Sequence, residues 1–573
     1  MTGHLWDAPI VPNVMSRTSE RLSTLADVFR NPQLRRLELS WAGYHLGEWT
    51  YFVGLSIYAF QVAGAAGLGA LGLARMVPAA IALPFGGMLT DRYARQRVLF
   101  AIYAARTLLF VVMATALAAD ADRVLVFALA GLAAVVSSPV PPAVMSLVPM
   151  LARTPRELVA TNVSSSTLEG LGTLAGPVIG GVLAATSGVE VAVGAAAAIN
   201  VVCAVLVGGI RREGDIRGPR RRVEHNLREE LLGGVRTLRR EPGPRRIVLL
   251  FNSQTMVRGL LNVLLVVASI ELLGMGEAGV GWLNAALGAG GLAGGIAAVG
   301  LVARRRLAGV FGAGLVLWGA PIALIGVWPR AGWALVCLGI VGIGNALLDV
   351  SGYTLLQRTV DEHLLGRVFG VFEIGVALTT AAGSVLGSVL VQELGIREAL
   401  VVSGLILPFL TLLSFPGLRR IDDSVEVPER ELGLVAEVPL FSLLPPTTME
   451  RLAARLEHLR VAAGATVVEE GEAGDRFYLV ASGEIDVIHG GSRVNTLGAG
   501  DYFGEIALLR DVPRVATCTA RTDAEIYSLS RDVFIAAVSG DMRSSTAAES
   551  VMGKRLHELE SRQTSSVGDG TPG

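Results

Sequence analysis

The sequence predicts a mostly α-helical membrane protein in which a twelve-helix bundle is followed by a small α+β domain. Of its 573 residues, 52% are hydrophobic and only 17% are charged, and the mean hydropathy is +0.54. A soluble domain has about a quarter of its residues charged. Apolar stretches of transmembrane length recur between about Leu37 and Phe415, whereas the segment 433–540 contains the alternating pattern of short strands.

The apolar stretches divide into two groups of six, which predicts two six-helix halves. Residues 1–36 form a cytoplasmic segment before the first half (37–210), and a basic loop at 211–246 leads to the second half (247–416). A linker is expected at 417–432, the α+β domain at 433–540, and a C-terminal helix and flexible tail at 541–573. The spans are predicted at about 37–60, 66–90, 97–119, 123–149, 158–186, 189–210, 247–273, 278–302, 308–328, 332–356, 367–391 and 398–416.

Positive charge alternates between successive loops. One set of loops is rich in arginine, for example at Arg92, Arg153 and Arg304. The other set, with sequences such as QVAGAAG, TSGVE and LGMGEAG, has almost no positive charge. Because positively charged loops remain on the cytoplasmic side, both termini are predicted to be cytoplasmic.

An internal repeat relates the two halves. The sequence GPVIGGVL at 176–183 aligns with GSVLGSVL at 383–390, an offset of 207 residues. The basic cluster RQRVL at 95–99 has a counterpart, RRRLA, 209 residues later. Two parallel six-helix halves joined by a long basic loop are the arrangement of a transporter whose halves rock about a central site.

The loop after the second span combines an acid with several arginines in GGMLTDRYARQRVL, 86–99. This sequence resembles the loop signature of the major facilitator superfamily, and the resemblance extends over about 35–415. It implies a bundle that transports by alternating access, with an ion-pair latch at this loop. Ordinary positive charge on a cytoplasmic loop is the alternative explanation. The latch residues are Gly87, Asp91, Arg92, Arg95 and Arg97.

A second sequence, GTLAGPVIGG, lies in the fifth span. It resembles the fifth-helix motif of drug and proton antiporters in the same superfamily. Glycines four residues apart permit close helix contact, and a proline kinks the helix. A structural role in packing is at least as good an explanation as a direct role in coupling. The motif residues are Gly172, Gly176, Pro177, Gly180 and Gly181.

Ionisable residues inside the spans are the candidates for transport chemistry, because charged groups in a membrane are costly and mark functional sites. Glu48 is the first candidate for proton coupling and Glu373 is the second. A buried carboxylate can bind and release a proton during a transport cycle. Arg258 is a candidate counter-ion, or a contact for an anionic substrate. Glu169 and Asp349 are further candidates, for which simple solvation near helix ends is the alternative.

The segment FGEIALLRDVPRVAT, 503–517, has the residue types that a cyclic nucleotide requires. Glu505 can accept a hydrogen bond from a ribose hydroxyl, and Arg514 can make a charge-assisted contact with a phosphate. Gly504 allows the backbone to approach closely, and 506–509 has the composition of a short helix. For either charged residue alone, a surface position beside an ordinary turn is the better explanation.

The surrounding sequence favours the nucleotide site. The region 433–540, with GDRFYLVASGEIDV before the segment, resembles the cyclic nucleotide-binding domain of catabolite activators, kinase regulatory subunits and gated channels. The resemblance implies a β-roll in which Glu505 binds ribose and Arg514 binds phosphate. Cyclic GMP readers often have Thr after this arginine, and Val515 has no hydroxyl, so cyclic AMP is favoured. The implied site residues are Phe503, Gly504, Glu505, Ile506, Ala507, Arg514, Val515 and Ala516.

Together these features predict a proton-coupled exporter of small molecules in a bacterial cell membrane, regulated by cyclic AMP or cyclic GMP. The lipid bilayer, protons and an unidentified small molecule are its expected partners. A membrane-tethered nucleotide receptor and an unregulated exporter with a vestigial sensor are the alternatives. No nucleophile–base set, Walker loop or metal-spaced His/Cys cluster points to an enzyme, a metal or another cofactor. No helix-turn-helix pattern follows the domain, so nucleic acid is not an expected partner.

Overall fold

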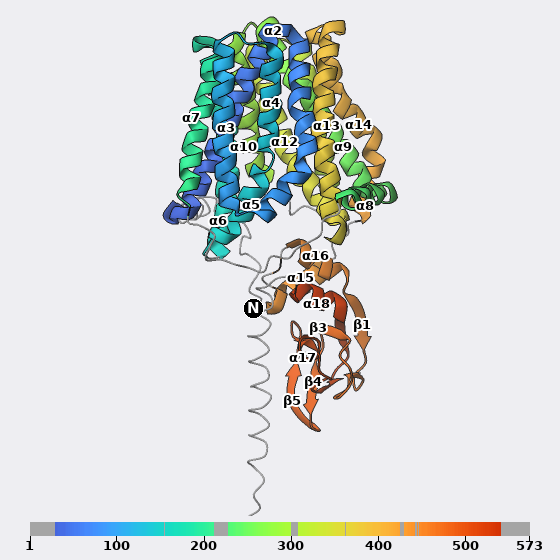
Figure 1. The fold of residues 1–573 in the computed structure, drawn as a ribbon. Helices are drawn as coiled ribbons and strands as arrows, with labels where there is room; N and C mark the ends of the chain where they lie inside the picture. Colours follow the sequence, from blue (N-terminus) through green and yellow to red (C-terminus); the bar gives the residue numbers. More distant parts are fainter. Residues whose placement is uncertain are drawn as a thin grey trace, which may run out of the picture. The chain divides into compact units, whose positions relative to one another are not determined.

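A computed structural model describes residues 29–153, 155–210, 227–298, 307–360, 362–424, 429–441, 444 and 446–539. The chain divides into two compact units, residues 1–422 and 423–573. The first unit is a helical bundle, and the second contains two β-sheets with short helices (Figure 1). This agrees with the predicted fold class.

The first half of the bundle begins with a very long helix, α2 (Pro32–Arg92), of 61 residues. A straight helix of that length would measure about 90 Å, roughly three times the hydrocarbon thickness of a bilayer. The backbone leaves helical geometry at Ala63 and Gly64, where Gly64 has a φ of 56°. α2 therefore supplies two spans joined at a kink. The other helices of this half are α3 (Arg95–Ala118), α4 (Arg123–Ser137), α5 (Val140–Leu151), α6 (Pro155–Ser187) and α7 (Val189–Gly208).

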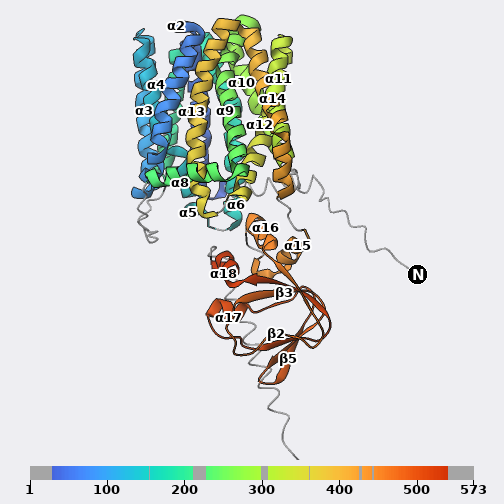
Figure 2. The same ribbon diagram turned by 90° about the vertical axis from the view of Figure 1, so that its right-hand side faces the viewer.

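The second half begins with a short amphipathic helix, α8 (Leu227–Arg240), which runs across the end of the bundle (Figure 2). Eleven helical stretches of the described residues are long and apolar enough to cross a membrane. Because α2 contains two spans, the total agrees with the twelve spans expected. The other helices of this half are α9 (Pro242–Val267), the π-helical turn η2 (Ala268–Leu272), α10 (Gly276–Ala298), α11 (Leu307–Val327), α12 (Ala331–Thr359), α13 (Glu362–Leu394) and α14 (Ile396–Ser424).

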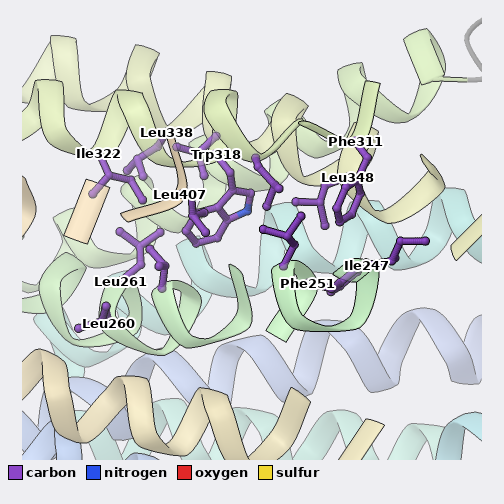
Figure 3. Close-up of a cluster of buried hydrophobic side chains, with 14 of the residues drawn as sticks. Ile247, Phe251, Leu260, Leu261, Phe311, Trp318, Ile322, Leu338, Leu348 and Leu407 are labelled. Atoms are coloured by element: carbon purple, nitrogen blue, oxygen red, sulfur yellow. The ribbon is translucent and has the colours of Figure 1, made fainter. Parts of the chain in front are cut away.

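A continuous apolar cluster holds the second half together (Figure 3). Trp318 and Phe311 of α11 are fully buried in it, and the ring of Phe251 in α9 lies 6.2 Å from that of Phe311. The indole N–H of Trp318 donates a hydrogen bond of 3.1 Å to Asn345. Because lipid is as apolar as these side chains, the cluster stabilises the half by close packing rather than by removal from water.

The two halves meet where small residues let helices approach closely. Gly72 of α2 lies against α13, and Gly281 of α10 lies against the carbonyl of Pro177 in α6. Neither glycine has room for a Cβ. Beside the kink of α2, Gln61 of the first half donates a hydrogen bond of 2.6 Å to Glu277 of the second. The halves are therefore closed against each other at the end of the bundle that contains the kink.

The last bundle helix is longer than hydropathy predicted. The twelfth span was expected to end at 416 and a linker to follow, whereas α14 continues to Ser424. Leu418 and Ile421 are buried in the core of the second half. The carboxylate of Asp422 accepts hydrogen bonds of 2.8 and 3.1 Å from backbone N–H groups at the start of α11. The packing of these residues and the hydrogen bonds of Asp422 extend the helix through a polar sequence. The predicted end of the twelfth span at 416 was therefore too early.

The basic segment 211–246 was expected to be a loop, but part of it is helical. Residues 227–240 form α8, and Gly234 lies against the backbone of Arg367 in α13. Several predicted segments lie outside the described residues. These are 1–28 of the N-terminal segment, 211–226 of the basic loop, 299–302 of the eighth span, and the helix and tail at 541–573.

The second unit contains two four-stranded antiparallel sheets, with strand orders β1-β8-β3-β6 and β2-β7-β4-β5. Two sheets of this kind form the expected β-roll. The strands are β1 (Glu457–Val461), β2 (Thr466–Val468), β3 (Arg476–Ser482), β4 (Ile485–His489), β5 (Ser492–Leu497), β6 (Tyr502–Phe503), β7 (Thr517–Ala520) and β8 (Ala524–Ser530). The helices are α15 (Glu429–Glu437), the turn η3 (Pro439–Phe441), α16 (Pro446–Ala454), α17 (Glu505–Arg510) and α18 (Arg531–Ser539).

Strand β3 shows how the sequence builds two cores from one sheet. Successive side chains of a strand point to opposite faces. Phe477 and Leu479 belong to a cluster with the helices, whereas Tyr478 and Val480 belong to a cluster between the strands of the roll. The alternating pattern that predicted this strand therefore reflects two apolar faces, one of which lies beside the candidate nucleotide site.

Candidate functional site

An open pocket lies in the second unit, and the space within it and at its mouth amounts to about 780 Å³. Strands β2, β4, β5 and β7 contribute to its wall, together with the segment 503–516. All eight residues expected from the sequence line it, namely Phe503, Gly504, Glu505, Ile506, Ala507, Arg514, Val515 and Ala516.

The turn from β6 into α17 brings two charged residues to this cavity. Gly504 has a φ of 91°, and a Cβ there would lie 2.6 Å from Nη1 of Arg514. Only glycine fits this position without strain. Glu505, the first residue of α17, is 2% exposed, and Arg514 is 4% exposed. Two buried charges of opposite sign thus line this cavity.

Backbone carbonyl groups hold the guanidinium of Arg514 in place. Nη1 donates to the carbonyl of Gly504 at 3.1 Å, and Nη2 donates to that of Arg476 at 2.7 Å. Nη2 also lies 3.3 Å from the carboxylate of Asp475, whose side chain is 75% exposed. Because water screens a carboxylate that is so exposed, much of the positive charge remains available to an anion.

The rest of the cavity is mainly apolar. Val515 and Leu497 line it, and Asn495 of β5 contributes a side-chain amide. Cys518 of β7 also lines it, and burial, followed by the charge of Glu505, raises the pKa of its thiol to about 12. The thiol is therefore neutral at physiological pH. Such a wall suits the flat face of a purine, while the charged end suits a phosphate and a ribose hydroxyl.

Glu48 lies within the first half of the bundle and contacts two arginines. Nη2 of Arg75 lies 2.7 Å from one carboxylate oxygen, and Nη2 of Arg106 lies 2.8 Å from the other. The side chains of Arg106, Arg75 and Glu48 are 0%, 7% and 24% exposed. Arg106 also donates to Asn200 at 2.9 Å and to the hydroxyl of Ser137. This triad, Glu48–Arg75–Arg106, links α2, α3, α4 and α7.

The other four transport candidates form a second cluster, to which both halves contribute. Asp349 of α12 interacts electrostatically with Arg258 of α9 and with Glu169 of α6. The hydroxyl of Tyr353 donates a hydrogen bond of 3.5 Å to Glu373 of α13. Tyr353 also interacts electrostatically with Asp349. Glu169, Arg258 and Glu373 are exposed. Arg258 thus lies within electrostatic range of Asp349, whereas Glu48 forms its ion pairs with other arginines.

The expected latch is only partly described. Gly87, Asp91 and Arg92 belong to α2, and the structure describes only their backbone. Arg95 begins α3, and its Nη1 contacts the sulfur of Met150 at 2.6 Å. Arg97 is exposed. The latch therefore remains a prediction.

The glycine motif of α6 lies at two helix interfaces. Gly172, Gly176 and Gly180 face the first span of α2, and a Cβ at any of them would collide with the backbone or side chains of residues 45–50. Gly181 faces α10 of the other half, beside Gly281. The motif thus allows α6 to approach one helix of its own half and one helix of the other.

Sequence reasoning missed the partnership of Arg75 and Arg106 with Glu48. Both arginines fall inside predicted spans, and a charged residue there requires a partner. That requirement was the available signal. The partners lie 27 and 58 residues away from Glu48, and no sequence spacing identifies which carboxylate they share.

Family models match both units of the chain. Residues 39–306 and 247–456 match the Major Facilitator Superfamily, and together these ranges include more than half of the chain. Residues 458–541 match the cyclic nucleotide-binding domain.

Curated relatives match a small part of the chain. A cAMP-dependent protein kinase regulatory subunit from Aspergillus niger is 43% identical over 104 residues, which is 18% of this chain and 25% of that protein. The corresponding subunit from Yarrowia lipolytica is 48% identical over 104 residues, 18% of this chain and 28% of that protein. The chain thus spans about a quarter of the length of these relatives.

Among solved structures, a cyclic nucleotide-binding-like protein from Brucella abortus matches with 28% identity and a TM-score of 0.17. The match includes 18% of this chain and 93% of that protein. The family matches agree with the helical bundle and with the β-roll described above. The chain therefore belongs to the Major Facilitator Superfamily and carries a cyclic nucleotide-binding domain.

Proposed function

We propose that this protein is a proton-coupled exporter of small molecules whose transport cycle is regulated by a cyclic nucleotide, with cyclic AMP favoured. The proposal of regulation depends on the cavity that the buried side chains of Glu505 and Arg514 line. This cavity belongs to the same chain as the transporter bundle. The preference for cyclic AMP is supported by Val515, which lines the cavity without a hydroxyl, and by the similarity to subunits named as cAMP-dependent.

The orientation follows from loop charge. The arginine-rich loops support the proposal that both termini and the nucleotide-binding domain lie on the cytoplasmic side of a bacterial cell membrane. The kink of α2 then lies at the opposite side, so the closed end of the bundle faces outward. The described conformation is accordingly inward-facing, with Glu169, Arg258 and Glu373 accessible from the cytoplasm.

Proton coupling is best placed in the cluster around Asp349. The two arginine partners of Glu48 belong to the same half as Glu48, so rocking of the halves leaves these ion pairs intact. Asp349 and Glu169 belong to different halves, and rocking changes the distance between their carboxylates. A like charge that approaches and withdraws changes proton affinity, which is what coupling requires. Glu48 is therefore better suited to organising the first half.

The closed end provides a test of alternating access. Replacement Gly281→Val should destabilise the closed state, because a Cβ at this position would overlap the carbonyl of Pro177. We expect faster modification of a Val280→Cys reporter, at a position that is 1% exposed, by a membrane-impermeant thiol reagent. The three native cysteines are buried and should contribute little background.

Gly295→Val is the matched control, because it adds the same side chain to α10 where nothing lies within 4 Å. Equal modification rates in the two variants would show that this interface does not control access. A faster rate in Gly281→Val alone would support a closed end that must open during transport.

Regulation requires that the nucleotide bind the two states of the transporter with different affinity. We expect the Kd for cyclic AMP to differ by about fivefold or more between full-length protein cross-linked at Gln61→Cys and Glu277→Cys and protein carrying Gly281→Val. Titrations of both forms in nanodiscs, with cyclic AMP and cyclic GMP, measure this difference. Equal affinities in the two forms would contradict regulation, while leaving nucleotide binding itself intact.

A further inference from the structure

Helix α8 has one side that packs on the bundle and another that the described residues leave uncovered. Gly234 lies on the packed side, against the backbone of Arg367 in α13. The uncovered side has large apolar and basic residues at i, i+3, i+4 and i+7, a spacing that places them on one face of a helix. These residues, the outer face of α8, are Leu232 (57% exposed), Val235 (37% exposed), Arg236 and Arg239.

The positive charge of α8 is concentrated towards its C-terminal end. The helix contains four arginines and two glutamates, and both glutamates lie in its first turn. Arg236, Arg239 and Arg240 are exposed, and none of them pairs with a carboxylate of the described residues. Arg245, near the start of α9, is also exposed, and its Nη1 lies 3.4 Å from the carbonyl oxygen of Arg239. Because Glu241 is the only acid within 236–245, this stretch has a clear excess of positive charge.

Helix α14 marks the level of the lipid headgroups on the same side of the bundle. Leu412 and Leu413 are 75% and 70% exposed, as expected for side chains that face lipid, and Phe415 is 45% exposed. The guanidinium of Arg419, one turn further, lies 4.5 Å from the ring centre of Phe415. Basic side chains near the ends of a span reach towards the headgroups. The change from exposed leucines to an arginine therefore places the headgroups near 415–419.

Two contacts connect α8 with this level. Arg246, in the first turns of α9, lies against Gly417 of α14. The preceding residue, Arg245, contacts the carbonyl of Arg239 in the last turn of α8. α8 runs across the spans rather than along them, and it lies on the outer side of α9 and α13 (Figures 1 and 2). Its outer face is therefore at the depth where headgroups surround the bundle.

We propose that the outer face of α8 is a binding surface for anionic phospholipids. Arg236 and Arg239 bind the headgroup phosphates, and Leu232 and Val235 reach the first part of the acyl chains. An amphipathic helix at a membrane surface binds through its apolar area and through attraction between basic residues and acidic lipids. A zwitterionic headgroup has a cation of its own, so the excess of arginine favours lipids with a net negative charge. The inference depends on neither transport nor nucleotide binding.

A reporter at Leu232→Cys measures the contact. The full-length protein, labelled there with bimane, is reconstituted in vesicles of phosphatidylglycerol and phosphatidylcholine, in which one of the two lipids has brominated, quenching acyl chains. The three native cysteines are buried and should react little. At equal mole fraction we expect brominated phosphatidylglycerol to quench more, with an enrichment of about fivefold or more over phosphatidylcholine. This preference should weaken at about 1 M salt, because salt screens exposed charges.

Two results with this reporter would overturn the proposal. Equal quenching by the two brominated lipids would contradict the preference for anionic headgroups. Absence of quenching by either lipid would show that water or protein covers the outer face. Collisional quenching by aqueous iodide then distinguishes water, which admits iodide, from protein, which excludes it.

A pair of double variants tests whether the site belongs to α8. Arg236→Gln with Arg239→Gln should bring the ratio of the two quenching constants close to one. Arg35→Gln with Arg153→Gln is the matched control, because it removes two exposed arginines from the same end of the bundle but outside α8. We expect this control to retain the preference. An equal loss in both variants, or a preference that survives the α8 replacements, would refute a lipid site on α8.

Discussion

Replacement of Arg514 by alanine should abolish nucleotide binding at concentrations that saturate the unmodified protein. The guanidinium is 4% exposed, lies in the cavity wall and is held by the carbonyls of Gly504 and Arg476. Removing one partner of a buried, hydrogen-bonded charge pair costs about 2–5 kcal/mol. This corresponds to a rise in Kd of roughly 30-fold to several thousandfold. Calorimetric titration of the full-length protein with cyclic AMP measures it.

The matched control is Arg521→Ala in the same unit. Arg521 is 51% exposed and forms an ion pair of 3.1 Å with Glu484, outside the cavity. We expect its removal to leave the Kd nearly unchanged, because an exposed ion pair contributes little. Arg514→Lys should retain part of the affinity, since it keeps the charge but loses the planar fork. Equal binding by Arg514→Ala and Arg521→Ala would refute the assignment of the phosphate site.

The second large effect is expected at Glu48. Replacement Glu48→Gln removes the carboxylate that Arg75 and Arg106 share at 2.7 and 2.8 Å, and Arg106 is completely buried. Breaking a buried pair by removing one partner costs about 3–5 kcal/mol. We therefore expect a large decrease in the free energy of unfolding of the detergent-solubilised protein, measured by thermal or denaturant unfolding.

Two comparisons make this result specific. Glu393→Gln makes the same chemical change at an exposed position near the end of α13, and it should have little effect. The double replacement Glu48→Gln with Arg75→Gln removes one of the two unpaired cations and should recover part of the lost stability. If Glu48→Gln were as stable as Glu393→Gln, the triad would not support the first half.

The nucleotide site could be predicted from the sequence because its charged residues are close together along the chain. Gly504, Glu505 and Arg514 lie within a dozen residues, and a turn and one short helix are enough to bring them together. The opposite wall was not predicted. Val468, Val487 and Cys518 reach the cavity from three separate strands, and their positions depend on sheet register. Apolar residues in strands carry no signal for which face will line a ligand cavity.

In the bundle, hydropathy predicts the spans but not the contacts between their side chains. Hydropathy identified the spans because each one satisfies its own backbone hydrogen bonds and must be apolar over its length. Which side chains meet inside the bundle depends on the rotation of each helix, and a uniformly apolar span does not specify that rotation. The end of α14 was misplaced for a related reason, since Asp422 extends the helix through contacts with α11.

The Glu48–Arg75–Arg106 triad also has a consequence for biosynthesis. A charged side chain at the centre of a span adds about 2.5–3.5 kcal/mol to the free energy of insertion into a membrane. The chain is made from its N-terminus, so Glu48 enters the bilayer before Arg75, and Arg75 before Arg106. Each arginine therefore arrives where its carboxylate is already present. The first three spans are thus the shortest part of the nascent chain that can bury all three charges together.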